Sequence, residues 1–115
     1  MISMEINQTC IDNVPIVSVS GRIDAATYKE LESILSDLID QNKSEIVLDL
    51  EGVTYISSVG LRVLLAAQKK VRPKNGGVKL VSLQPFVREV FEMTGFNRLF
   101  TIHSNQIEAL RSIKS

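Results

Sequence analysis

The chain has very little of several residue types, and each shortage excludes a class of protein. A single cysteine, Cys10, rules out an internal disulfide and fits a reducing compartment. With only one histidine, His103, besides that cysteine, the sequence offers a poor ligand set for zinc. The 13 basic and 13 acidic residues give a formal net charge of zero, which argues against a nucleic-acid-binding protein held mainly by phosphate contacts.

Long apolar runs are also missing. No stretch approaches the roughly 20 apolar residues that a membrane-spanning helix needs. The first six residues have neither the basic segment nor the long apolar segment of a secretion signal. We therefore expect a cytoplasmic protein that binds no membrane. With no repeat, low-complexity segment or linker, residues 1–115 are expected to form one domain, and 44% hydrophobic residues are enough for its core.

Apolar residues that alternate with polar ones predict two strands at the start of the chain. Ile2, Met4 and Ile6 alternate in this way, and so does the segment 14–20. Asp12-Asn13 lies between these segments and supplies residues that favour a turn. The two segments together predict a β-hairpin.

The rest of the chain alternates between helical and strand patterns. Further strands are predicted at residues 46–50, 78–83 and 99–103, and helices at about 25–41, 58–71, 85–94 and 107–113. Asp24 is expected to cap the first helix, and Asp49 to lie near the end of its strand. Pro85 fits the first turn of the third helix, and Gly95 fits a left-handed end to it. The order β-β-α-β-α-β-α-β-α predicts an α/β domain whose mixed, mostly parallel sheet begins with a hairpin and is packed by about four helices.

Two adjacent hydroxyls, Ser57 and Ser58, precede the second predicted helix. A helix N-terminus presents backbone N–H groups and a dipole that favour negative charge, so this position could carry a phosphate. One serine could simply cap the helix, but capping needs one hydroxyl and not two. Gly60 lies in the first turn, where glycine costs about 1 kcal/mol relative to alanine. We expect its missing side chain to leave the preceding hydroxyl accessible.

The stretch 48–62, Leu-Asp-Leu-Glu-Gly-Val-Thr-Tyr-Ile-Ser-Ser-Val-Gly-Leu-Arg, resembles the signature of bacterial anti-sigma factor antagonists, the STAS domain family. The resemblance extends over nearly the whole chain. It includes the motifs at residues 21–24, 76–77 and 93–96, whose order and spacing carry it together. A single STAS-like domain is the fold that it implies.

In that family, a partner serine kinase that doubles as an anti-sigma factor phosphorylates a serine at the start of the second helix, and a PP2C-type phosphatase removes the phosphate. The resemblance implies that Ser58 is the phosphorylated residue and that the chain is a binding protein, without catalytic activity, cofactor or metal. The unphosphorylated form would bind the kinase and free the sigma factor. The partner-binding residues implied are Asp24, Ser57, Ser58, Gly60, Leu61 and Arg62.

The sequence departs from the family pattern beside this serine. Many members carry Asp immediately before the phosphorylated serine, where this chain has Ser57. The next residue after the serine is often Ser, Thr or Ala, where this chain has Val59. The departure leaves Ser57 open as an alternative phosphorylation site.

Three other interpretations compete with this one. A serine hydrolase lacks support because Ile56 interrupts any G-x-S-x-G elbow and His103 lies in the last predicted strand. A phosphate-receiving domain could use Asp49, but no acidic pair follows the first strand to hold Mg²⁺. A STAS-like module that binds partners with its serines unmodified stays open.

Overall fold

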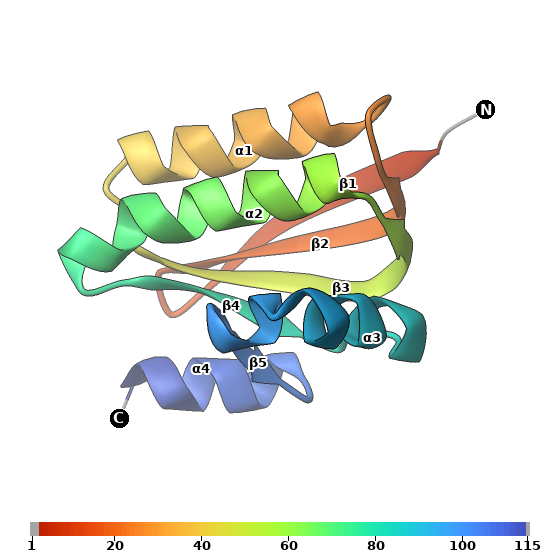
Figure 1. Ribbon diagram of the computed structural model, residues 1–115. Helices are drawn as coiled ribbons and strands as arrows, with labels where there is room; N and C mark the ends of the chain where they lie inside the picture. The colour runs from red at the N-terminus through yellow and green to blue at the C-terminus, as the bar shows by residue number, and fades with distance from the viewer. Residues whose placement is uncertain (1–2, 115) are drawn as a thin grey trace.

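One five-stranded sheet, in the order β1-β2-β3-β4-β5, organises the computed structural model, which describes residues 3–114 (Figure 1). The predicted strand residue Ile2 lies outside the described residues. The strands are β1 Met4–Ile11, β2 Val14–Ile23, β3 Glu45–Ile56, β4 Gly77–Val81 and β5 Thr101–His103. The helices are α1 Tyr28–Asp40, α2 Ser58–Val71, α3 Pro85–Thr94 and α4 Gln106–Lys114, with short 3-10 turns η1 Arg72–Lys74 and η2 Phe96–Arg98.

The predicted hairpin begins the sheet. β1 and β2 are antiparallel, and Ile11 pairs with Val14 across the turn. Asp12 and Asn13 have positive φ angles of 52° and 68°. Such angles match the right-handed twist of a two-residue hairpin, and Asn and Asp adopt them more readily than most residues. Every later strand pair is parallel, so the prediction of a mixed, mostly parallel sheet is confirmed.

Helices cover both faces of the sheet. In Figure 1, α1 and α2 lie side by side over one face and α4 lies on the opposite side. The central strand β3 is buried from both sides, as its nearly continuous apolar run predicts. Ile46 and Leu48 join the large core with α1, α2 and α3, whereas Val47 packs in a second cluster with Ala109 of α4. No described helix is long and apolar enough to cross a bilayer.

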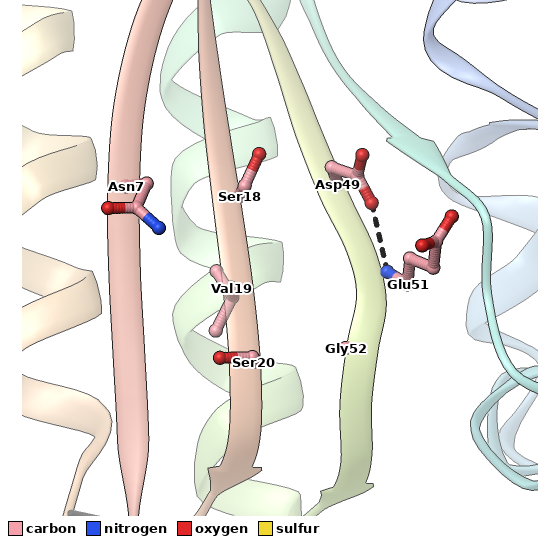
Figure 2. A pocket seen from close by; sticks show the side chains of 7 residues that line it. All are labelled: Asn7, Ser18, Val19, Ser20, Asp49, Glu51 and Gly52. Atoms are coloured by element: carbon pink, nitrogen blue, oxygen red, sulfur yellow. Dashed lines mark hydrogen bonds between the residues drawn. The ribbon is translucent and has the colours of Figure 1, made fainter.

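Beyond α4, that second face is open and polar. Figure 2 shows Asn7, Ser18, Ser20, Asp49 and Glu51 along three neighbouring strands, where they line a shallow depression. Asp49 Oδ1 accepts a hydrogen bond from the backbone N–H of Glu51 over 2.9 Å. Asn7 and Glu51 are exposed to solvent. The uncovered face therefore belongs to β1, β2 and the middle of β3.

The strand containing Asp49 is longer than predicted. β3 continues to Ile56, so Asp49 lies in its middle and not near its end. The pairing shifts where Ser18 faces Asp49 but Ser20 faces Gly52, which leaves one extra residue on β3. An extra residue of this kind breaks the alternation of inward and outward side chains, which is why the sequence pattern ends early.

The first helix also begins later than predicted. α1 starts at Tyr28, after a turn formed by residues 25–27, and Asp24 caps that turn instead of the helix. The second and third helices begin and end as predicted. Gly95 ends α3 with a φ of 78°, the left-handed conformation predicted for it. β4 and β5 are shorter than their predicted ranges, 78–83 and 99–103.

Candidate functional site

The two serines lie at the junction between β3 and α2. Ser57 has an extended backbone, with φ −91° and ψ 174°, and Ser58 is the first helical residue. The Ser57 hydroxyl accepts a hydrogen bond from the Gly60 N–H over 3.3 Å, and the Ser57 carbonyl accepts one from the Leu61 N–H over 2.9 Å. Ser57 is therefore the N-cap of α2.

Ser58 is placed differently from its neighbour. Its side chain is exposed, and its hydroxyl has no hydrogen-bond partner among residues 3–114. As the first helical residue, it leaves its own N–H and that of Val59 without a carbonyl acceptor inside the helix. An anion attached to Ser58 would meet these N–H groups and the positive end of the helix dipole.

The loop after β2 lies directly beside this helix start. Ile23 pairs with Ile56, and the Ser57 N–H donates to the Ile23 carbonyl over 2.9 Å. Asp24 follows immediately, so the parallel pairing of β2 and β3 brings the loop after β2 next to the serine pair at the end of β3.

Asp24 holds its loop through a compact set of hydrogen bonds. Its Oδ1 accepts from the Ala26 N–H over 3.0 Å and from the Thr27 hydroxyl over 3.3 Å. The Asp24 N–H donates to Thr27 Oγ1 over 2.9 Å. The Ala26 N–H, followed by the hydrogen bond and charge of Arg22, holds the pKa of the Asp24 carboxyl below its ordinary value. The Asp24 carboxyl is therefore ionised at neutral pH.

Arg22 is a neighbour that the sequence did not indicate. Its Nε lies 3.4 Å from Asp24 Oδ2, and its guanidinium carbon lies 4.3 Å from the centre of the Tyr55 ring. Arg22 and Tyr55 are paired across β2 and β3. Only the register of the two strands could have revealed this contact, since the residues are far apart in sequence.

Gly60 and Leu61 have a different role from the one expected. A Cβ on Gly60 would lie 2.8 Å from Ile23 Cγ2 and from Ile56 Cγ1, so glycine here permits close packing and does not open access to a hydroxyl. Leu61 is only 5% exposed, so its side chain supports the helix from the core. Arg62 is exposed.

The residues on which the competing interpretations depend make other contacts in the structure. Asp49 accepts hydrogen bonds from the Glu51 N–H and, over 2.6 Å, from Gln106 Nε2. The nearest hydroxyl recorded for His103 is that of Ser112, at 3.5 Å. Within residues 3–114, no three His, Cys, Asp or Glu side chains gather as a metal site would require.

Comparison with known proteins gives the same family that the sequence motifs resemble. The family model of the STAS domain matches residues 5–109. BtrV of Bordetella bronchiseptica, named as an anti-sigma factor antagonist, is 36% identical over 112 residues, which are 97% of each chain. The anti-sigma-F factor antagonist RsfB of Mycobacterium tuberculosis is 28% identical over 105 residues, 90% of this chain and 84% of that protein.

A solved structure shares the fold. The crystal structure of an anti-sigma factor antagonist from Mycobacterium paratuberculosis superimposes with a TM-score of 0.91 at 30% identity. The superposition covers 98% of this chain and 96% of that one. The match therefore includes the sheet, the helices and the β3–α2 junction.

Proposed function

The chain belongs to the STAS domain family, and we propose that it works as an anti-sigma factor antagonist, a binding protein and not an enzyme. Relatives named for this function match it along nearly their whole length, which supports the proposal. Its partner would be an anti-sigma factor, and binding that partner would free a sigma factor for transcription.

We further propose that the partner is a serine kinase and that it phosphorylates Ser58. The observation that carries this proposal is the different use of the two serines. Ser57 is half-buried and its hydroxyl is engaged as the helix cap, whereas Ser58 is exposed with an uncommitted hydroxyl among the described residues. A kinase could reach Ser58 without opening the helix. Ser57 is the less favourable target because its phosphorylation would remove the cap.

The switch follows from charge. A phosphate adds about −1.5 to −2 charges at the start of α2. The helix dipole favours an anion there by roughly 0.3–1 kcal/mol, so the fold is expected to survive phosphorylation. A partner surface docked on Ser58 would instead bury an unpaired dianion beside the Asp24 carboxylate. That arrangement costs several kcal/mol, or about 100-fold or more in affinity.

Asp24 would hold the partner in the unphosphorylated state. Its carboxylate is ionised at neutral pH and lies on the loop bonded to the helix start. A basic side chain of the partner could bind it, in competition with the weak Arg22 contact at 3.4 Å. A PP2C-type phosphatase would restore this state, since the exposed position of Ser58 suits hydrolysis as well as transfer.

Purification of the tagged protein from its own cells tests both parts of the proposal. Mass spectrometry of the purified complex should find an anti-sigma factor kinase and phosphate on Ser58. Calorimetry with that kinase should give wild-type affinity for Ser58→Ala and a loss of about 100-fold for Ser58→Asp. Ser58→Asn is the matched control, because it changes the same exposed residue to a side chain of nearly the same size as Asp without adding negative charge.

Two results would argue against the phosphorylation proposal. One is unchanged affinity in Ser58→Asp, and the other is phosphate found on Ser57 alone. A protein that binds the anti-sigma factor but is never phosphorylated would be a binding module with unmodified serines.

A further inference from the structure

The outer edge of β1 is the longest unpaired strand edge in the described part of the chain. β1 ends the sheet and pairs only with β2 among the described residues, whereas the opposite edge, β5, has three residues. Natural edge strands usually carry lysine, proline or a bulge that discourages pairing with another chain. β1 has neither lysine nor proline, its one charged residue is Glu5, and its pairing with β2 runs without a shift.

Two observations show which backbone groups point outward from this edge. Ile11 and Val14 flank a two-residue turn, and such turns close on a hydrogen-bonded pair. At the other end of the hairpin, the Arg22 N–H donates to the Ser3 carbonyl over 2.8 Å. Both place the odd-numbered residues of β1 in hydrogen bonds to β2. The even-numbered residues then direct their N–H and C=O groups away from the sheet, and these are Met4, Ile6, Gln8 and Cys10.

We propose that this edge pairs with the β1 edge of a second copy of the chain, antiparallel, about a two-fold axis at Asn7. In that register Ile6 lies opposite Gln8 of the second copy, and Met4 lies opposite Cys10. It is the one register in which every outward-facing residue of β1 gains a partner. The two sheets would then continue as one.

The side chains of β1 fit this register. Asn7 meets Asn7 of the second copy on the open polar face seen in Figure 2, where two amides can hydrogen-bond to each other. Glu5 lies opposite Thr9 of the second copy, so the two Glu5 carboxylates, one from each strand, do not face each other. A register centred on Glu5 would place two carboxylates in direct opposition, which is destabilising.

A second copy suits this edge better than an unrelated strand, because the edge is complementary to itself and the assembly is complete at two chains. A two-fold contact uses the same surface on both chains and ends at two copies. The short β5 leaves little edge for a third copy. The contact is centred on Asn7 and does not include Ser58, although its Met4 end lines a depression with Ala26 and Thr27 of the Asp24 loop. The dimer therefore does not rest on the proposed function.

The mass of the full-length protein in solution tests the proposal. Sedimentation equilibrium should show a reversible dimer in the wild type and in Gln8→Ala. Gln8→Pro should be monomeric, because it removes an outward N–H from an exposed position while sparing the bonds to β2. Circular dichroism should show that its fold is retained. A wild-type protein that stays monomeric up to about 1 mM overturns the proposal, whatever else binds β1.

A cysteine scan tests the register without proline. Across the axis, the two Asn7 Cα atoms would be about 4.5 Å apart, within the range of a disulfide. In a Cys10→Ser background, mild oxidation should link Asn7→Cys into a dimer. Thr9→Cys is the matched control, since residue 9 faces residue 5 and should not link to itself. Equal cross-linking of both variants, or none in a dimeric protein, would show that another surface or register holds the copies together.

Discussion

The backbone N–H of Ser57 donates to the carbonyl oxygen of Ile23 over 2.9 Å, and this bond ties the end of β2 to the start of α2. It places the loop that begins at Asp24, one residue after Ile23, next to the start of α2. The close approach depends on Gly60, whose Cα faces the side chains of Ile23 and Ile56. The geometry of the site is thus fixed from the core side, below the residues that a partner would touch.

We predict that Gly60→Ala destabilises the fold. The added Cβ would lie 2.8 Å from two isoleucine carbons and 3.2 Å from the Ile23 carbonyl oxygen, so α2 would have to shift. Overpacking of this kind typically costs about 1–3 kcal/mol, which exceeds the roughly 1 kcal/mol that alanine gains in helix propensity. Urea denaturation measures the loss.

Gly77→Ala is the matched control for that variant. The nearest heavy atom to its added Cβ is Lys79 Nζ at 3.7 Å, an ordinary contact at the end of a flexible side chain. Gly77→Ala should therefore keep the wild-type stability or raise it. Equal stability of the two variants would mean that the packing at Gly60 is not tight.

The sequence was most informative where a structural feature depends on a single residue and its immediate neighbours. The serine pair marked the start of α2, Pro85 the start of α3, and Gly95 its end, because capping, a fixed φ and a left-handed turn are local properties. The two loops that meet at the site were also predictable, since parallel strands end at the same edge of a sheet.

Long-range register was not predictable. The extra residue in β3 between Asp49 and Gly52 interrupts the strand pattern. Arg22 faces Tyr55 only because the pairing shifts a second time, between Gly21 and Arg22. The start of α1 was misplaced for another reason. Asp24 can cap a helix or a turn equally well, and the Thr27 hydroxyl selects the turn.

Replacing Ser57 should lower the stability of the fold more than replacing Ser58. Ser57→Ala removes the hydroxyl that accepts from Gly60 N–H and should lower the unfolding free energy by about 1 kcal/mol. Ser58→Ala removes an exposed hydroxyl and should change it by less than about 0.5 kcal/mol. Thermal unfolding of both variants measures the difference. The assignment of the cap would be wrong if Ser58→Ala were the less stable variant.

The stabilising effect of Asp24 should depend on pH. Its pKa is held below the ordinary value, first by the Ala26 N–H and then by Arg22, so the folded state favours the ionised form. The stabilisation is complete above the unfolded pKa of about 3.9 and is lost as the pH falls through the lower folded value. Asp24→Asn should therefore be less stable than the wild type at neutral pH, and the gap should close in acid.

Urea denaturation at a series of pH values measures that gap. Arg22→Met should raise the Asp24 pKa only in part, because the larger contribution comes from the Ala26 N–H. A titration of the carboxyl by NMR reports this directly. A stability difference between Asp24→Asn and wild type that stays constant with pH would contradict the prediction.

Gln68 should stabilise the fold although it is a polar residue buried on a helix. It is only 8% exposed, and its amide bridges the start of β4 and the turn before β5. Nε2 donates to the Leu99 carbonyl over 2.8 Å, and Oε1 accepts from the Val78 N–H over 2.7 Å. Gln68→Met keeps a similar volume but leaves a buried N–H without a partner. The expected loss is about 1–3 kcal/mol.

The exposed neighbour Lys69 supplies the control for this variant. Lys69→Met makes a comparable change on the solvent side of α2 and should alter stability by less than about 0.5 kcal/mol. Amide exchange distinguishes the mechanism from a general loss of packing, because Gln68→Met should speed exchange at Val78 more than at Leu80, the next inward residue of β4. Uniform acceleration along β4 would show that the bridge acts only through helix packing.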